Sequence, residues 1–365
     1  MQFRNLGRTG LKVTAVGFGG IPIMGANCPV GCVPEDEAVR VVRYALDKGI
    51  NFIDTARSYS DSERRIGLAI RGRSPRPYIA TKTYIDRKGE NLERFSRDMD
   101  ESLAALGVDS IDLYQIHYID QGFELAFGPR GAVAQMQKAK EEGKIRHIGV
   151  TAHDPDMAVR ALETGEFETV QVPYNVVKAE AAQKLFPYCL EHNIGVICMK
   201  PIAGGALATP HELQQHLAGK DLPTATNALR FVLSQPAVSV AIPGMDSTLE
   251  VDENAAVAAG EAIEPLSGSE IERIRERLAL LGEQFCHNCA YCDAVCSAEL
   301  PLSEIFKLER YYKLYALRDL AQQRFKELHR SADECLDCKK CEEKCPYRVP
   351  IRERLKEAAR LLSES

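Results

Sequence analysis

Short, mainly apolar segments alternate with amphipathic segments along most of the chain. The apolar segments lie at 13–20, 50–53, 78–81, 111–116, 145–150, 170–172, 195–199 and 238–242. Short apolar runs bounded by turn residues predict buried parallel strands. The segments between them have helical spacing; in 35–48, for example, the apolar residues share one face and Gly49 ends the helix. Eight such repeats with short links predict an α/β fold, a closed (β/α)8 TIM barrel.

Polar residues follow three consecutive strands of this predicted barrel. Asp54 and Tyr59 come after the strand at 50–53, whereas Lys82 and His117 end the next two strands. Alone, each is more often a helix cap, a packing tyrosine, a surface lysine or a structural histidine. Because active-site groups of such barrels lie at the strand ends, we expect all four on one rim. There a lysine stabilises a phenolate, and an aspartate keeps that lysine charged.

With these residues the sequence resembles the aldo-keto reductase superfamily, whose Asp-Tyr-Lys-His tetrad falls on Asp54, Tyr59, Lys82 and His117. The resemblance runs from about Leu6 to Asn254, and the Asp-Thr-Ala-x-x-Tyr segment is its most specific motif. It implies hydride transfer between a nicotinamide and the carbonyl carbon of a small molecule. Tyr59 would donate the proton, Lys82 would lower its pKa, Asp54 would hold Lys82, and His117 would orient the carbonyl or share the proton.

The resemblance also implies contacts to the nicotinamide ring of NAD(H) or NADP(H). Thr151 stands where the family often has a serine for the carboxamide, and Gln171 stands where it has a glutamine. Both side chains can make these hydrogen bonds, although a capping threonine and an ordinary rim glutamine remain the alternative. Met199 replaces an aromatic ring that many relatives stack on the nicotinamide, and a thioether can also pack on a ring face.

The remainder of the cofactor is assigned by the same resemblance. Pro201, Gly204 and Gly205 belong to a loop whose backbone amides bind the pyrophosphate in the family. Glu253 and Asn254 match the pair that contacts the adenine.

The 2′-phosphate of NADP lacks its usual partners. Gly244, Met245 and Glu250 stand in place of a lysine, a hydroxyl residue and an arginine. Because a carboxylate repels a phosphate, we expect a preference for NAD(H), or at most indifference.

Eight of the twelve cysteines form two motifs near the C-terminus, each with the spacing C-x2-C-x2-C-x3-C. The first motif consists of Cys286, Cys289, Cys292 and Cys296, and the second of Cys335, Cys338, Cys341 and Cys345, followed by Pro346. This is the bacterial ferredoxin pattern for two [4Fe-4S] clusters, in which the fourth cysteine of each motif binds the other cluster. One cluster would therefore take Cys345 with the first three cysteines, and the other would take Cys296. Zinc is the alternative, but a zinc site uses four ligands and would leave the rest unused.

The cysteine motifs mark a second domain. We predict a barrel domain at 1–282 and a small, mostly helical ferredoxin-like domain at 283–365, resembling the α-helical ferredoxins, because the residues between the motifs have helical spacing. A capping box at 269–272 begins the last helix of the barrel domain, and a terminal helix is expected at 352–362. Cys28 and Cys32 match no strong metal motif, so we expect free thiols there.

Charge and hydropathy limit the partners. The formal net charge of −6, without a long basic block, argues against nucleic acid. No apolar run approaches the roughly 18 residues of a membrane span, and the N-terminus has no signal-peptide core, so we expect a cytoplasmic protein.

The two kinds of chemistry do not couple directly. A hydride carries two electrons, whereas each cluster accepts one, so exchange with nicotinamide requires a mediator such as a flavin. Either the clusters pass electrons from a ferredoxin-like donor to a barrel-bound flavin or substrate radical, or they work independently of hydride transfer. The alternative functions are an iron-sulfur electron-transfer protein whose barrel binds a flavin or a partner, and clusters that only stabilise the fold. Nothing in the sequence names the substrate.

Overall fold

The computed structural model describes residues 1–25, 33–85, 89–205, 207–208, 213, 224–282, 284–288, 291–345 and 347–363 of the 365. The internal contacts divide the chain into two compact units. Most of the first unit comes from the chain up to Pro201 together with Leu229–Pro265, and the second from Ile202–Ala228 and Leu266 onward. The predicted domain boundary at residue 282 stays a prediction.

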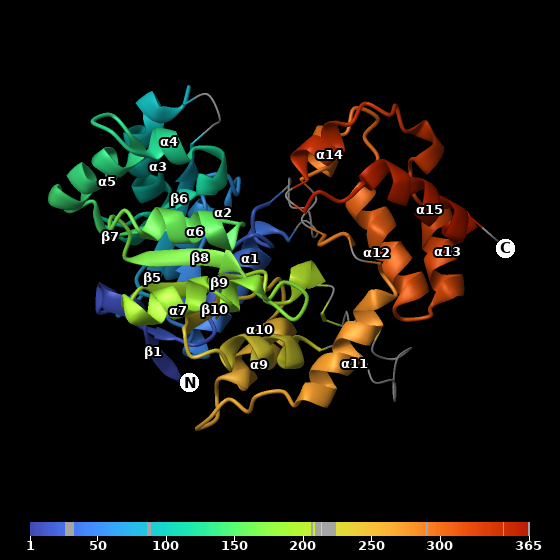
Figure 1. Cartoon of the computed structure of the whole chain (residues 1–365), viewed down its shortest axis with the longest axis horizontal. Coiled ribbons are helices and arrows are strands. Elements are labelled where there is room, and N and C mark those ends of the chain that lie inside the picture. Colours follow the sequence, from blue (N-terminus) through green and yellow to red (C-terminus); the bar gives the residue numbers. More distant parts are fainter. Residues whose placement is uncertain are drawn as a thin grey trace. The chain divides into compact units, whose positions relative to one another are not determined.

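The first unit is built on one sheet of eight parallel strands in consecutive order. These strands are β3 (Phe18–Gly19), β4 (Phe52–Asp54), β5 (Tyr78–Tyr84), β6 (Ile111–His117), β7 (Ile145–Thr151), β8 (Thr169–Pro173), β9 (Gly195–Met199) and β10 (Val238–Ile242) (Figure 1). Bridges between Val16 and Ala241 and between Gly19 and Gly244 join the two edges. The sheet therefore closes, and the predicted (β/α)8 TIM barrel is confirmed.

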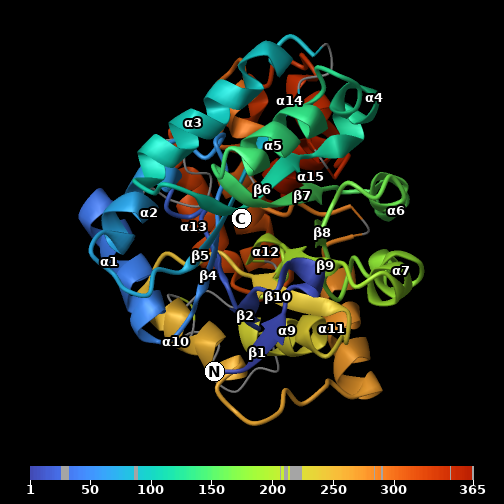
Figure 2. The ribbon, with the colours of Figure 1, turned by 90° about the vertical axis from the view of Figure 1, so that its left-hand side faces the viewer.

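Helices connect successive strands, because parallel neighbours require a crossover. They are α1 (Glu35–Asp47), α2 (Ser62–Ile70), α3 (Phe95–Leu106), α4 (Phe123–Ala126), α5 (Ala132–Glu141), α6 (Pro155–Leu162), α7 (Leu185–Glu191), α9 (Ala225–Leu233) and, after the last strand, α10 (Thr248–Val257). Helices α1, α2, α3, α5, α6 and α7 surround the strands in Figure 2. Short 3-10 helices lie at Gly7–Thr9, Leu92–Arg94, Ile119–Gln121, Glu180–Ala182 and Ala203–Gly205.

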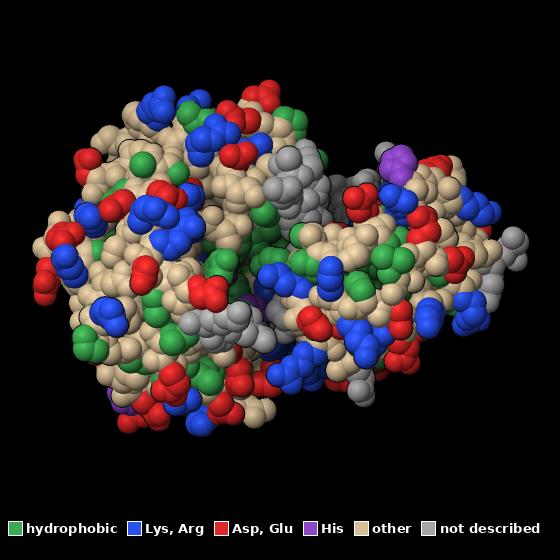
Figure 3. Space-filling view, turned by 90° about the horizontal axis from the view of Figure 1, so that it is seen from above, with side chains coloured by type: hydrophobic (Ala, Val, Ile, Leu, Met, Phe, Trp, Pro, Cys, Tyr) green, Lys and Arg blue, Asp and Glu red, His purple; other side chains and the backbone are tan. Residues whose placement is uncertain are grey.

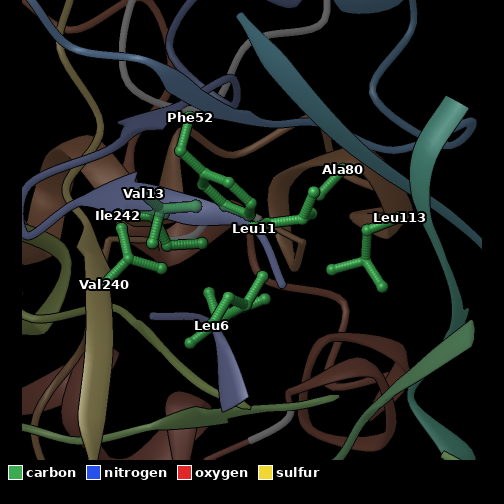
Figure 4. Packing of buried hydrophobic residues seen from close by; sticks show 9 residues of the cluster. Leu6, Leu11, Val13, Phe52, Ala80, Leu113, Val240 and Ile242 are labelled. Atoms are coloured by element: carbon green, nitrogen blue, oxygen red, sulfur yellow. The ribbon is translucent and has the colours of Figure 1, made fainter. Parts of the chain in front are cut away.

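An antiparallel hairpin of β1 (Phe3–Asn5) and β2 (Lys12–Thr14) precedes the barrel. Leu6 of this hairpin packs against Gly195, the first residue of β9, so the hairpin lies at the amino end of the strands. Its apolar side chains join those of the strands in one buried cluster, shown in Figure 4, of Leu6, Leu11, Val13, Phe52, Ala80, Leu113, Ile197, Val240 and Ile242. The hairpin and the barrel strands therefore share one apolar core.

The hairpin corrects one prediction. The segment 13–20 is not a single strand, because Val13 pairs with Arg4 in the hairpin and only Phe18–Gly19 joins the barrel sheet. The beginning of the segment pairs with β1 and its end pairs with β4, and a continuous run of apolar residues does not reveal this change of partner.

The second unit is mostly helical. It contains α11 (Gly268–Ala279), α12 (Leu302–Lys313), α13 (Arg318–Lys326), α14 (Lys340–Lys344), α15 (Ile351–Ser363) and short 3-10 helices at Asp293–Val295 and Ala332–Glu334. Helices α12, α13 and α15 pack together. Inside this group Arg354 of α15 donates two hydrogen bonds to the buried Glu309 of α12, at 2.8 and 3.0 Å. The paired charges compensate each other away from water.

The capping box of α11 lies two residues earlier than predicted. Ser267 accepts from the N–H of Glu270, and Glu270 accepts from the N–H of Ser267. Ser269 is helical, because a serine two residues upstream supplies the same cap.

No helix among the described residues is both long enough and apolar enough to cross a membrane. On the face seen in Figure 3, Lys and Arg side chains are interspersed with Asp and Glu.

Candidate active site and cysteine cavities

Asp54, Tyr59, Lys82 and His117 come together at the carboxyl end of the barrel. The amine of Lys82 lies 2.6 Å from Asp54 Oδ2 and donates to the Thr55 carbonyl at 2.8 Å. The same amine lies 5.2 Å from the ring centroid of Tyr59. The rings of Tyr59 and His117 meet edge to face, with centroids 5.9 Å apart. One cation, one phenol and one imidazole therefore share a small space.

Burial and charge oppose each other at Asp54 and Lys82. Burial lowers the pKa of Lys82, and Asp54 acts in the opposite direction. Burial likewise raises the pKa of Asp54, opposed by Lys82 and by hydrogen bonds from Gln171 and Gln115. Each charge thus depends on the other, because neither has access to water.

The surroundings of His117 favour its neutral form. Burial lowers the pKa of His117 well below its ordinary value, and the positive charges of Lys82 and Lys200 add to the shift. Its Nδ1 is buried without a hydrogen-bond partner among the described residues. A neutral imidazole can still donate one hydrogen bond.

Two further buried residues belong to this network, and the sequence interpretation missed them. Gln115 donates to Gln171 Oε1 at 3.1 Å and lies 3.4 Å from Asp54 Oδ1. Glu63 accepts from Thr81 at 2.7 Å, and its charge opposes the lowering of the Lys82 pKa by burial. The available signal for Gln115 was its position two residues before His117, since alternate residues of a strand share a face.

The two residues expected at the nicotinamide carboxamide are both buried at the rim. Thr151 ends β7, and its Oγ1 accepts from the N–H of Tyr118 at 2.7 Å. Gln171 accepts from Gln115 and also hydrogen-bonds Asp54. Thr151 keeps its hydroxyl proton for another acceptor. Met199 ends β9 next to them and is partly exposed.

The other predicted cofactor residues are spread over both units. Pro201 follows β9 in the first unit, whereas Gly204 and Gly205 belong to the second unit and adopt left-handed backbone angles, with φ of +65° and +85°. Asn254 of α10 is buried, and its Oδ1 has no partner among the described residues. Glu253, next to it in α10, is partly buried.

Glu250 is folded back on its own helix end. Its carboxylate accepts from the N–H of Asp246 at 2.8 Å, while its own N–H is capped by Ser247. Burial raises the pKa of Glu250 to about 7, and the charge of Asp246 adds to the rise.

The cysteines line two cavities in the second unit. One, of about 350 Å³ including space open to solvent, is lined by Cys296, Cys335, Cys338 and Cys341. The other, of about 340 Å³ on the same basis, is lined by Cys286, Cys292 and Cys345. In both cavities the fourth cysteine of one motif lies with cysteines of the other motif. Cys289, Pro346, Cys28 and Cys32 lie outside the described residues.

The two motifs repeat each other in backbone as well as in spacing. Asn288 and Asp337, each two residues after the first cysteine, both have left-handed angles, with φ of +50° and +51°. In both motifs the residue after the third cysteine is an acid whose carboxylate accepts a backbone hydrogen bond from the following helix. Asp293 accepts from the N–H of Ser303 in α12, and Glu342 accepts from the N–H of Arg352 in α15, each at 3.0 Å. The unit therefore contains two copies of one cysteine-bearing structure.

The described cysteines form no single-ion site. Among the described residues, no three His, Cys, Asp or Glu side chains are grouped closely enough to hold a single metal ion. The four described cysteines of the larger cavity surround a volume instead.

Two family models match separate, consecutive parts of the chain. The aldo/keto reductase family model matches residues 15–279, and the model of the 4Fe-4S dicluster domain matches residues 284–349. L-galactose dehydrogenase from Arabidopsis thaliana is 33% identical over 308 residues, which cover 77% of this chain and 94% of that protein.

Two solved structures are similar to the barrel. The holo form of an aldo-keto reductase from Bacillus halodurans is 25% identical, with a TM-score of 0.60, and the match covers 76% of this chain and 96% of that one. An aldo/keto reductase from Klebsiella pneumoniae in complex with NADP and acetate is 26% identical, with a TM-score of 0.60, covering 76% and 95%.

Proposed function

Because the chain belongs to the aldo/keto reductase family of oxidoreductases and carries a 4Fe-4S dicluster domain, we propose that it transfers a hydride between a nicotinamide dinucleotide and the carbonyl carbon of a small molecule. The observation that carries the proposal is the buried Lys82 amine, 2.6 Å from Asp54 and 5.2 Å from the Tyr59 ring centroid. This arrangement fits a phenol that must lose its proton during the reaction.

Tyr59 is the proton donor in this proposal. When a hydride reaches a carbonyl carbon, negative charge develops on the oxygen, and a phenol beside it can supply the proton. The ammonium group of Lys82 stabilises the resulting phenolate, while Asp54 balances the lysine charge.

His117 orients the carbonyl. Of the two roles that the resemblance left open, sharing the proton requires an imidazolium, whereas the environment lowers the pKa of His117 and favours the neutral ring. A neutral ring donates a hydrogen bond to the carbonyl oxygen and polarises it.

The chain offers suitable groups for the dinucleotide. The buried Oδ1 of Asn254 needs a donor, such as the amino group of an adenine. The hydroxyl of Thr151 can donate to the carboxamide oxygen, and Gln171 lies with it on the rim. Pro201, Gly204 and Gly205 would hold the pyrophosphate, and Met199 would pack on the ring, as the family resemblance implies. When bound, the nicotinamide supplies or accepts the hydride.

The cysteines fit two [4Fe-4S] clusters. Four thiolates per cluster are the required ligands, and the larger cavity supplies Cys296, Cys335, Cys338 and Cys341. The smaller supplies Cys286, Cys292 and Cys345, to which Cys289 would be added. Two clusters use all eight cysteines, whereas a zinc site uses four ligands and would leave the rest unused.

When bound, the clusters supply one-electron transfer. Leu336 is 65% exposed and Cys338 is exposed at the edge of the larger cavity, which favours access by a ferredoxin-like donor. A flavin is the class of cofactor needed to join single electrons to hydride chemistry.

The test of the hydride proposal is Tyr59→Phe. Removal of a general acid should lower turnover of an aldehyde such as 4-nitrobenzaldehyde by about 10²- to 10⁴-fold. Nicotinamide affinity, measured by fluorescence titration, should stay unchanged because the hydroxyl is not part of the cofactor pocket. Tyr84→Phe is the control, since Tyr84 ends β5 and is 48% exposed. Parent-level turnover in Tyr59→Phe would show that the tetrad is not the proton donor system.

A further inference from the structure

The two cysteine cavities differ in the charge and the exposure of the residues that line them. The larger cavity is lined by Lys339 and Arg352 in addition to its cysteines, and its Cys338 is exposed. The smaller cavity is lined by aromatic rings, and none of the described residues that line it is Lys, Arg, Asp or Glu. Its described cysteines are buried or only partly exposed. Because the reduction potential of a [4Fe-4S] cluster depends on nearby charge, on hydrogen bonds to its sulfurs and on exposure, the two sites are not equivalent.

A lysine and a serine lie beside the exposed cysteine of the larger cavity. Lys340 Nζ donates to Ser297 Oγ at 2.9 Å, and the same oxygen lies 3.9 Å from the sulfur of Cys338. Because an ammonium group can only donate, Ser297 accepts from Lys340 and keeps its own proton for another acceptor. A cysteine that binds a cluster is a thiolate and can only accept. In a loaded site the Ser297 hydroxyl therefore donates toward Cys338, with the positive charge of Lys340 next to it.

The equivalent positions of the other motif carry neither group. When the two motifs are aligned by their cysteines, Tyr291 stands at the position of Lys340, and Pro346 stands at the position of Ser297. A proline has no hydroxyl group, and a phenol carries no positive charge at neutral pH. The difference between the two sites therefore comes from side chains at matched positions, since the cysteine spacing and the backbone are shared.

The acid after the third cysteine adds to this difference. In the first motif Asp293 Oδ1 lies 3.6 Å from the sulfur of the preceding cysteine and accepts from the N–H and the hydroxyl of Ser303, which carries no charge. In the second motif the equivalent Glu342 pairs with Nε of Arg352 at 3.1 Å, although the same guanidinium also pairs with Asp337 at 2.6 Å. An added electron is repelled more by a carboxylate held by neutral donors than by one that pairs with a cation.

We propose that the two clusters differ in reduction potential, that the cluster of the larger cavity takes the first electron, and that Ser297 and Lys340 set this order. The inference rests on the proposed function, since it takes the two [4Fe-4S] clusters assigned there as its premise. The step adds one electron from a ferredoxin-like donor to one cluster, and the added negative charge is stabilised by a nearby ammonium group and hydroxyl donor. The cluster that is reduced first is then also the one with the exposed ligand Cys338.

The test is a potentiometric titration of the anaerobically purified holoprotein with dithionite and redox mediators, followed by electron paramagnetic resonance. The parent should show two separate one-electron steps. Ser297→Ala should lower the equilibrium constant of the first reduction about two- to tenfold, the effect of one hydrogen bond, and should leave the second step nearly unchanged. A tenfold change equals about 59 mV for a one-electron couple. Lys340→Met should shift the same step in the same direction, and Lys340→Arg should restore most of the parent value.

Further variants make the test specific. Lys326→Met removes an exposed lysine of α13 that lines neither cavity, and its titration should match that of the parent. Cys335→Ser should lack the first step and Cys286→Ser should lack the second, which assigns each step to its cavity. Ser297→Ala and Lys340→Met keep all eight motif cysteines, so their iron content should equal that of the parent. If one of these two variants loses iron, the other decides.

Equal potentials of the two clusters, clusters that resist reduction, or a first step that belongs to the smaller cavity would overturn the proposal. An unchanged first step in both iron-loaded variants would also overturn it, because Ser297 and Lys340 would then not set the order. These outcomes leave the two assigned clusters in place, whereas a parent purified without iron contradicts the clusters and the inference together. Hydride transfer is not involved in any outcome, since neither a carbonyl substrate nor a nicotinamide enters the titration.

Discussion

At the scale of single residues, the site depends on charges that are kept from water. Lys82 is 1% exposed and Asp54 is 3% exposed, and each is the main compensation for the other. Such a pair contributes little net stability, but the loss of one partner leaves the other charge buried.

We therefore expect Asp54→Asn to lower the free energy of unfolding by about 3–5 kcal/mol, since it leaves the Lys82 ammonium without its carboxylate. Urea unfolding measures the change. Asp156→Asn, which breaks the exposed pair with Lys184, should cost only about 0–1 kcal/mol. Similar values for the two variants would show that Lys82 is neutral in the folded protein.

Glu250 should make NADPH binding depend on pH. Its pKa is raised to about 7, so the carboxylate takes up a proton as the pH falls through that value. If the side chain faces the 2′-phosphate, repulsion decreases, and NADPH should bind roughly 3- to 10-fold more tightly at about pH 6 than at about pH 8.

Fluorescence titration of both reduced cofactors, with Glu250→Gln as the control, tests this dependence. The 2′-phosphate also titrates, but it does so equally in parent and variant, so their ratio isolates Glu250. NADH should show no such trend. Identical pH profiles for NADPH in the two proteins would place Glu250 away from the phosphate, and clearly tighter NADPH than NADH at high pH would disprove the expected NAD(H) preference.

At the scale of elements, the loop after β9 contacts the first cysteine motif within the second unit. A Cβ at Gly204 would lie 1.5 Å from the carbonyl oxygen of His287, the residue after Cys286. Gly205 also has a left-handed backbone, yet a Cβ there would meet nothing within 4 Å. An alanine at position 204 would therefore add a steric clash to the backbone strain, whereas an alanine at position 205 would add the backbone strain alone.

Gly204→Ala should displace the His287 segment and impair the proposed cluster that includes Cys286. We expect up to about half of the iron to be lost, as one of two clusters is affected. Gly205→Ala should retain its iron, because it adds only the cost of the left-handed angle, roughly 1–2 kcal/mol. Iron analysis and the visible spectrum of the anaerobically purified proteins measure the difference. Full iron content in Gly204→Ala would show that the loop after β9 accommodates the alanine without displacing the first cysteine motif.

At the scale of the whole molecule, the two cavities combine cysteines from distant parts of the chain. Cys345 lies with Cys286 and Cys292, whereas Cys296 lies with Cys335, Cys338 and Cys341. If these are the ligand sets, a mutation of the fourth cysteine of one motif should remove the cluster that the other motif's first three cysteines bind.

Cys345→Ser and Cys286→Ser should therefore lose the same electron paramagnetic resonance signal after dithionite reduction. Cys296→Ser and Cys335→Ser should lose the other signal, and each variant should retain about half of the iron. Cys189→Ser, a buried cysteine outside both motifs, should keep both signals. Loss of the same signal in Cys345→Ser and Cys335→Ser would mean that each motif binds its own cluster. Clusters that resist reduction altogether would favour a purely structural role.

The sequence by itself determined the features that depend on the pattern of neighbouring residues. Strands β6, β9 and β10 have the predicted bounds or nearly so, because runs of apolar residues between turns reflect burial directly. The order of strands and helices determined the barrel, and the cysteine spacing determined the dicluster domain, since both are properties of consecutive residues. Asp54, Tyr59, Lys82 and His117 could be chosen for the same reason: strand ends of a barrel meet at one rim.

Only the tertiary structure decided which polar groups contact each other across that rim. Gln115 meets Gln171, and Lys200 meets His153, through barrel closure and one left-handed residue that no periodicity indicates. Val13 was predicted in the first barrel strand, but its backbone pairs with Arg4 of the antiparallel hairpin instead. Local patterns record burial along a segment, whereas contacts between residues 47 or 56 positions apart depend on how the closed barrel orients each strand end.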